Sequence, residues 1–323
     1  MLAWLFPGQG TQTVGMGQDL YAGSPAARET LELADQVLDF PLTHLMFQGP
    51  AEELQATINA QPAIVATSLA AMAALREAWA AVHDTPLPRP ALVAGHSVGE
   101  YSALVASGAA DAATALRLVR ARAEAMHDAG QRRPGGMTAV LGLSREAVAE
   151  ACGKAREEVP ESYVAVANHN ADTQVIIAGD PDGLAAAARH CQAAGARRCV
   201  PLAVSAAFHS AAMAPAEELL RRAVEAARLR DAAVPVVANA APRPVTSAAE
   251  LADELVTQVA QPVLWVDCLR VMRAAGVGAF LELGPGKVLT NLLTRLEPAP
   301  AAAAAGDMDG VRAAVRWLQE QAA

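Results

Sequence analysis

A short segment around residue 97 places the strongest constraint on the fold. The apolar run 90–94 is typical of a short buried strand, and residues 98–108 are typical of a helix. Between them stands Gly95-x-Ser97-x-Gly99, the strand–turn–helix setting in which G-x-S-x-G forms a nucleophile elbow. The glycines suit a turn too tight for side chains, and the helix N-terminus directs N–H groups toward a developing oxyanion. The segment predicts a catalytic serine, against the alternative of an ordinary strand–helix turn.

Composition narrows the class of protein. The 323 residues allow one large domain and a smaller one, and 53% hydrophobic against 18% charged residues predict a sizeable core. A net charge of −9 and an aromatic content of 4% argue against nucleic acid or an anionic membrane as partner. We expect no apolar segment long enough to span a membrane and no signal peptide. The four cysteines show no C-x-x-C spacing, which favours free thiols in a reducing, cytoplasmic compartment.

The order of predicted elements indicates an α/β protein with a second unit. Residues 137–202 follow the order β-α-β-β-α-β of a ferredoxin-like arrangement. The first strand, 2–6, runs into a glycine-rich turn that places Gln9 at its carboxyl edge. A long helix is expected to open at Gln61-Pro62, with the proline in its first turn. Near the end, 299–306 reads as a low-complexity linker before a terminal helix.

One arginine stands out on a predicted helix over residues 112–128. Its apolar face includes Val119 and Met126, and Arg122 falls on the flank of that face. A buried guanidinium must find an anion or be costly. The residues alone leave two alternatives open: a ligand-binding arginine, or a structural one that pairs with a carboxylate or caps carbonyls.

A serine nucleophile also needs a base, for which the chain offers seven histidines. His209 is the best candidate because it lies in a small-residue segment that re-enters the large domain. The side chain of His96 should diverge from that of Ser97, and His169 is expected in a loop. The other four lack a motif and are expected to be solvated, namely His44, His83, His127 and His190.

Several motifs together resemble a known family. In chain order they are FPGQG, GHSVGEYSALVASG, the arginine in LVRARAEAM, AFHS, QVAQPVLW and LGPGKVL. The chain to about residue 296 is similar to malonyl-CoA:acyl carrier protein transacylases and to the acyltransferase domains of fatty acid and polyketide synthases. The resemblance implies an α/β-hydrolase-like domain of residues 1–131 and 203–298, an inserted ferredoxin-like domain of residues 132–202, and a linker and helix at 299–323.

The resemblance also implies roles for site residues. Ser97 would accept the acyl group from coenzyme A as an ester in a ping-pong reaction, with His209 as base and then acid. The main-chain carbonyl of Gln258 would orient this histidine, and the backbone N–H groups of Gln9 and Val98 would form the oxyanion hole.

Two further residues bear on the acyl group. Arg122 would hold the malonyl carboxylate, which selects the first alternative above. Phe208, in the sequence Ala-Phe-His, matches the form that accompanies malonyl rather than methylmalonyl units.

The expected partners are malonyl-CoA and a separate acyl carrier protein whose phosphopantetheine thiol accepts the acyl group. We expect a monomer with no permanently bound cofactor and no metal site. Because carrier proteins are acidic, docking needs a local basic patch, for which three pairs are candidates: Arg132-Arg133, Arg189-His190 and Arg197-Arg198. Each pair is equally well explained as ordinary solvated side chains.

Other functions remain open at this point. A malonate decarboxylase subunit or a stand-alone polyketide acyltransferase would use the same chemistry with a different carrier. A serine hydrolase would more often place an acidic residue as the orienter of the histidine and has no need of Arg122. A non-catalytic scaffold is disfavoured by the intact set of Ser97, His209 and Arg122.

Overall fold

The larger of two sheets forms the centre of the molecule. The computed structural model describes residues 1–204 and 206–322. Six strands lie in the order β10-β9-β1-β2-β7-β8, and neighbours are parallel except β7 and β8. Their bounds are Leu2–Phe6 (β1), Leu92–Gly95 (β2), Val236–Val237 (β7), Pro244–Val245 (β8), Ala279–Leu283 (β9) and Ala301–Ala305 (β10).

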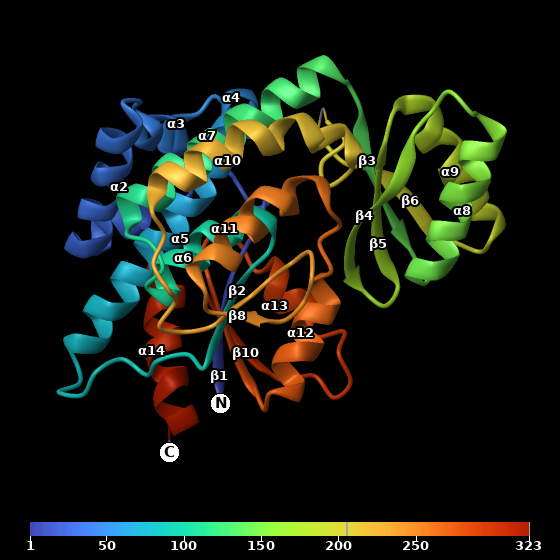
Figure 1. Cartoon of the computed structure of the whole chain (residues 1–323). Helices are drawn as coiled ribbons and strands as arrows, with labels where there is room; N and C mark the ends of the chain where they lie inside the picture. The colour runs from blue at the N-terminus through green and yellow to red at the C-terminus, as the bar shows by residue number, and fades with distance from the viewer. Residues whose placement is uncertain (205, 323) are drawn as a thin grey trace.

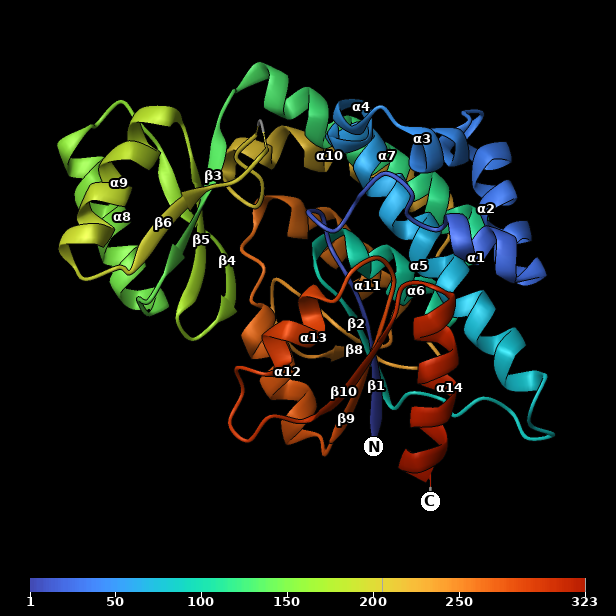
Figure 2. The ribbon, with the colours of Figure 1, turned by 180° about the vertical axis from the view of Figure 1, so that it is seen from behind.

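Both faces of this sheet are covered, as a parallel sheet requires. Trp4 and Phe6 of β1 belong to one core, whereas Ala3 and Leu5 belong to the other, because alternate side chains point to opposite faces. The first core is completed by α1 (Gln18–Gly23), α2 (Pro25–Leu38), α3 (Leu42–Gln48), α4 (Ala51–Gln55), α5 (Thr57–Ala80), α6 (Glu100–Ser107), α7 (Ala112–Arg132), α10 (Ala214–Ala227), α11 (Ala248–Thr257) and α14 (Met308–Ala322). The second core is completed by α12 (Trp265–Ala274) and α13 (Val288–Leu293) (Figures 1 and 2).

A second, antiparallel sheet projects from one side of the molecule (Figure 1). Its strands lie in the order β4-β5-β3-β6, and two helices pack on its outer face around a separate core. The elements are β3 (Gly136–Leu141), α8 (Arg145–Glu158), β4 (Val164–Ala171), β5 (Gln174–Gly179), α9 (Pro181–Ala193) and β6 (Arg198–Pro201). This is the predicted β-α-β-β-α-β order. Edge strand β4 contacts the segment that precedes α12. The N–H of Val263 in that segment donates to the Ala167 carbonyl of β4 at 2.9 Å.

Two local predictions were wrong. The expected linker contains strand β10, in which Ala301 pairs with Ala279 and Ala305 with Leu283. An alanine run has low strand propensity, but the open edge of β9 supplies hydrogen-bond partners that outweigh it. Helix α5 begins at Thr57, so Pro62 lies inside it rather than in its first turn.

Pro62 is tolerated inside α5 because the carbonyl that it leaves without a helical partner is satisfied elsewhere. A proline lacks the N–H that would bond the carbonyl four residues earlier. That carbonyl belongs to Ile58, and it accepts a hydrogen bond from Arg120 Nη1 at 3.1 Å.

Helix α5 also corrects the expectation that no segment is long and apolar enough to cross a membrane. By length and composition Thr57–Ala80 is such a segment, but 83% of its most apolar stretch is buried inside the protein. The helix packs against α2, α7 and α14. Its apolar character is that of a core helix.

Candidate active site

Ser97 occupies a strained turn between β2 and α6, and the backbone explains the glycines on either side. Its φ is 53°, in the left-handed region that costs a non-glycine residue about 1–3 kcal/mol. A Cβ on Gly95 would lie 1.9 Å from the Gly99 carbonyl carbon, and one on Gly99 would lie 2.2 Å from the Phe6 oxygen. The sequence therefore folds here as the predicted elbow, with the strand, a short 3₁₀ turn (Ser97–Gly99) and the helix in succession.

The predicted base lies against the serine. Ser97 Oγ is 2.7 Å from His209 Nε2, and His209 Nδ1 is 2.9 Å from the main-chain oxygen of Gln258. A carbonyl oxygen can only accept a hydrogen bond, so Nδ1 carries the ring proton and Nε2 is the bare acceptor. This tautomer is the one that can take a proton from the serine hydroxyl.

The environment keeps His209 neutral. The ring is 4% exposed, and burial lowers its pKa to about 3, with the nearby Arg122 charge as a second cause. Both effects disfavour the charged imidazolium. At neutral pH the histidine is thus ready to act as a base.

The side chain of Arg122, in the buried part of α7, also contacts Ser97. It is 1% exposed, and its Nη2 donates to Ser97 Oγ at 2.9 Å and to Gln258 Oε1 at 3.0 Å. Its Nε has no hydrogen-bond partner among the described residues. Burial lowers the pKa of the guanidinium, yet an arginine side chain stays charged in a protein. A cation with spare donors therefore faces the nucleophile.

The side chain of Gln258 links these groups, which the sequence did not indicate. Its Nε2 donates to the Ser97 carbonyl at 3.1 Å and to Glu100 Oε2 at 2.6 Å. With both amide hydrogens used, Oε1 is left to accept from Arg122. Gln258 thus contacts the arginine with its side chain and the histidine with its backbone.

Two more buried polar residues at the elbow were missed by sequence reasoning. Glu100, in the first turn of α6, is 2% exposed, and burial raises the pKa of its carboxyl group. Asn239, just beyond β7, is fully buried and contacts the backbone of Ser97. The available signals were weak: an acid in an otherwise apolar helical turn, and an amide just past the carboxyl end of a strand.

The other predicted site residues surround this centre. Gln9 follows the carboxyl end of β1, and the side chain of Gln9 donates to Thr57 Oγ1 at 3.4 Å. The carbonyl of Phe6, the last residue of β1, accepts a hydrogen bond from the His96 N–H at 2.9 Å. Val98 is fully buried in the elbow, and Phe208 is 5% exposed beside His209. A cleft of about 570 Å³ opens next to Gln9, between the start of α5 and the chain around Val204.

Two other candidate histidines have partners other than Ser97. His96 Nε2 is 2.9 Å from Asn170 Oδ1, whereas Ser97 Oγ is 2.7 Å from His209 Nε2. His169 lies within strand β4 and is buried, so its expected place in a loop was wrong. Its N–H donates to the Val263 carbonyl at 2.8 Å, which explains why this polar stretch is ordered as a strand. Among residues 1–204 and 206–322, no group of three or more His, Cys, Asp or Glu could hold a metal ion.

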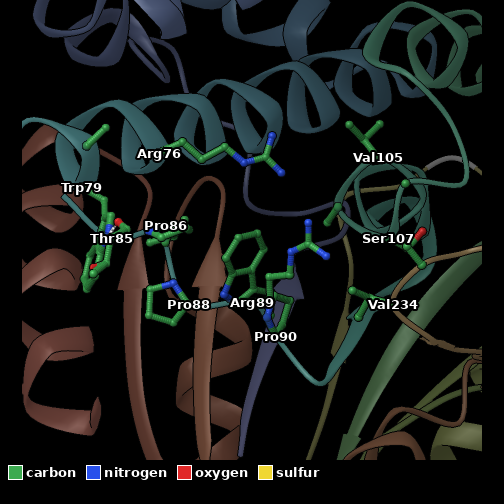
Figure 3. A pocket seen from close by; sticks show the side chains of 16 residues that line it. Arg76, Trp79, Thr85, Pro86, Pro88, Arg89, Pro90, Val105, Ser107 and Val234 are labelled. Carbon is green, nitrogen blue, oxygen red and sulfur yellow. Dashed lines mark hydrogen bonds between the residues drawn. The ribbon is translucent and has the colours of Figure 1, made fainter. Parts of the chain in front are cut away.

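A separate pocket of about 470 Å³ lies near the amino ends of strands β2 and β7 of the large sheet (Figure 3). Its lining includes Pro90, just before β2, and Val234, just before β7, whereas Ser97 follows the carboxyl end of β2. Arg76 and Arg89 extend into this pocket in Figure 3. It is lined by none of the residues around the nucleophile, and the C-terminal ends of α5 and α6 border it.

Comparison with known proteins assigns the family. The acyl transferase domain model matches residues 3–320. The chain belongs to the acyl transferase family. It is 41% identical over 315 residues to the malonyl CoA-acyl carrier protein transacylase of Escherichia coli K12, covering 97% of this chain and 98% of that protein. The expected resemblance is thereby confirmed.

Solved structures of the family share the fold. An acyl carrier protein S-malonyltransferase from Vibrio cholerae superposes with a TM-score of 0.89 at 37% identity, covering 97% of this chain and 99% of that one. A malonyl-transacylase solved in complex with its type II polyketide acyl-carrier protein superposes with a TM-score of 0.90 at 37% identity, covering 98% of this chain and 99% of that one. The α/β architecture of this acyl transferase is therefore that of its relatives.

Proposed function

We propose that this acyl transferase moves a malonyl group from coenzyme A to the phosphopantetheine thiol of an acyl carrier protein. The observation that carries the proposal is the buried Arg122, whose Nη2 lies 2.9 Å from the nucleophile oxygen Ser97 Oγ. An acyl group on that oxygen would bring a free carboxylate within reach of the guanidinium. Relatives named as malonyl transacylases, and one solved with its carrier protein, support the same substrates.

The first half-reaction follows from the serine–histidine pair. Ser97 Oγ attacks the thioester carbonyl while His209 Nε2 takes its proton. Backbone N–H groups of Gln9 and Val98 stabilise the oxyanion. Collapse breaks the C–S bond, and the imidazolium returns its proton to the departing coenzyme A thiolate. The enzyme is left as a malonyl ester of Ser97.

The second half-reaction reverses these roles with a new thiol. His209 takes the proton of the carrier's pantetheine thiol, whose sulfur attacks the ester carbonyl. The C–O bond to Ser97 breaks, and the histidine gives the proton back to the serine oxygen. We propose that the pantetheine arm approaches through the cleft beside Gln9 in both halves.

Selectivity is proposed to rest on two side chains. Arg122 favours acyl groups with a free carboxylate, because a charge-assisted pair in a buried site is strong. The ring of Phe208 is proposed to fill the space that an α-methyl group needs, which favours malonyl over methylmalonyl. One methyl group changes binding by only about 1–3 kcal/mol, so a preference rather than full rejection follows.

We interpret the two sheets as an α/β-hydrolase-like domain of residues 1–131 and 203–298 with a ferredoxin-like insertion of residues 132–202. The strand order β4-β5-β3-β6 and the separate core support the insertion. The proposed third segment, 299–323, needs amending, because its strand β10 joins the large sheet.

A basic surface near the insertion is proposed to dock the acidic carrier protein, with the enzyme acting as a cytoplasmic monomer. Arg189 and His190 are the weakest candidates, since both contact Glu158. Arg133 lies at the junction of the two units, with its guanidinium 3.8 Å from the centroid of the Tyr163 ring. Arg132 precedes it at the end of α7, so this pair is the preferred patch.

Mass spectrometry after incubation with malonyl-CoA tests the function. We expect a malonyl adduct on Ser97 that disappears when a holo carrier protein is added. Release of free malonate without transfer to any thiol would favour a serine hydrolase instead. Transfer to the carrier of a decarboxylase or of a polyketide pathway would keep the chemistry and identify the alternative partner.

A further inference from the structure

One buried side chain from a distant segment makes two hydrogen bonds to the backbone of the nucleophile elbow. Asn239 Oδ1 accepts the Ser97 N–H at 2.7 Å, and Asn239 Nδ2 donates to the Gly95 carbonyl at 2.8 Å. The two bonds fall on either side of the turn. The amide therefore bridges the last residue of β2 and the nucleophile, while Ser97 sits at its unfavourable φ of 53°.

Asn239 is itself held in a fixed position. Its own N–H is accepted by Glu100 Oε1 at 2.9 Å and by Glu254 Oε1 at 2.8 Å. Glu100 belongs to α6, which follows the elbow, and Glu254 belongs to α11. Glu100 is buried and Glu254 is half-buried, and burial raises the pKa of each carboxyl group. Two carboxyl groups on one donor cannot both be ionised easily. A pair that retains a proton can share this N–H without strong repulsion.

These contacts also reach the partners of the nucleophile. The second oxygen of Glu100 accepts from Gln258 Nε2 at 2.6 Å. Gln258 in turn contacts His209 through its carbonyl and Arg122 through its side chain. The elbow, the base and the arginine thus share one buried hydrogen-bond network that includes Asn239.

We propose that Asn239 is a positioning residue that holds the Ser97 elbow in its strained conformation, and so aims both Ser97 Oγ and the adjacent Val98 N–H. The expected effect on malonyl transfer rests on the proposed function. The proposed role of Asn239 in holding the serine does not. Without Asn239 the turn is free to relax toward a common backbone conformation. Misplacement of a reacting group by about 1 Å can cost on the order of 10²-fold in rate.

Two substitutions separate the bonds that Asn239 makes. Asn239→Ala removes both of them. Asn239→Asp has nearly the same shape and keeps an acceptor for the Ser97 N–H, but replaces the donor with an oxygen facing the Gly95 carbonyl. Glu282→Gln is the matched control, because Glu282 is also buried and binds backbone N–H groups, those of Leu289 and Thr290, two strands away from β2.

The decisive readout is the rate at which a small fluorophosphonate labels Ser97, measured on folded protein well below its melting temperature. We expect labelling to slow by roughly 10- to 100-fold in both Asn239 variants and to stay near wild type in Glu282→Gln. In malonyl transfer the loss should fall on kcat rather than on KM for malonyl-CoA. Asn239→Asp should fold even if Asn239→Ala does not.

Labelling of folded Asn239→Asp at the wild-type rate would overturn the proposal. So would an equal slowing in Glu282→Gln, because the effect would then reflect general loosening. A wild-type protein that takes the fluorophosphonate but no malonyl group would contradict the proposed function alone. The labelling comparison would still decide the role of Asn239.

Discussion

Replacing Arg122 with leucine should change which acyl groups the enzyme transfers. In the structure the guanidinium is 1% exposed and uses Nη2 for Ser97 Oγ and Gln258 Oε1. Its Nε has no hydrogen-bond partner among the described residues, so donors remain for a carboxylate on the acyl group. Leucine keeps the site filled and apolar but offers no donor.

The expected loss follows from leaving a buried malonyl carboxylate unpaired. Removing one partner of such a pair costs about 2–5 kcal/mol. Malonyl transfer should therefore fall by on the order of 10² to 10³ in kcat/KM. Acetyl has no carboxylate, so its transfer should be unchanged or improved.

The assay compares kcat/KM for malonyl-CoA and acetyl-CoA, with acyl transfer to a holo carrier protein followed by mass spectrometry. Arg117→Leu is the control, because Arg117 lies on the same helix but is exposed. The reasoning is refuted if Arg122→Leu loses both activities equally. Arg122 would then serve the fold or the serine, not the acyl carboxylate.

Four further outcomes are expected. Ser97→Ala should abolish the malonyl adduct without unfolding the protein, and transfer near the wild-type rate would rule out Ser97 as nucleophile. Phe208→Ser should raise methylmalonyl relative to malonyl transfer by roughly 10-fold or more, whereas an unchanged ratio would place the selectivity elsewhere. Because the pKa of His209 is lowered to about 3 from the ordinary histidine value of 6.5, acylation of Ser97 should persist below pH 6.5. A fall in the acylation rate centred at pH 6.5 would contradict this. The unfolded chain protonates His209 below pH 6.5 and the folded protein does not, so thermal stability should decrease as the pH falls toward 3.

Local sequence determined the elbow. The buried strand, the turn that leaves no room for a side chain at Gly95 or Gly99, and the helix of small residues all lie between residues 92 and 107. Steric exclusion at such short range leaves a readable pattern. The same holds for the β-α-β-β-α-β order of residues 136–201, which follows from the period of their apolar side chains.

Other features required the tertiary structure. The alanines of β10 carry no strand signal, and only the exposed edge of β9 makes them a strand. Whether Arg122 binds a ligand or a buried carboxylate was undecided by its helix alone. Its contacts come from Ser97, 25 residues away, and Gln258, 136 residues away.

The supports beneath the nucleophile show the same limit most clearly. Asn239 is 142 residues from Ser97 and 139 from Glu100 in the chain, and all three are buried together. A hydrogen bond between such distant segments leaves no periodicity or spacing in the sequence. Local sterics and apolar patterning thus determined where the serine is presented, whereas long-range burial of polar groups decided what holds it there.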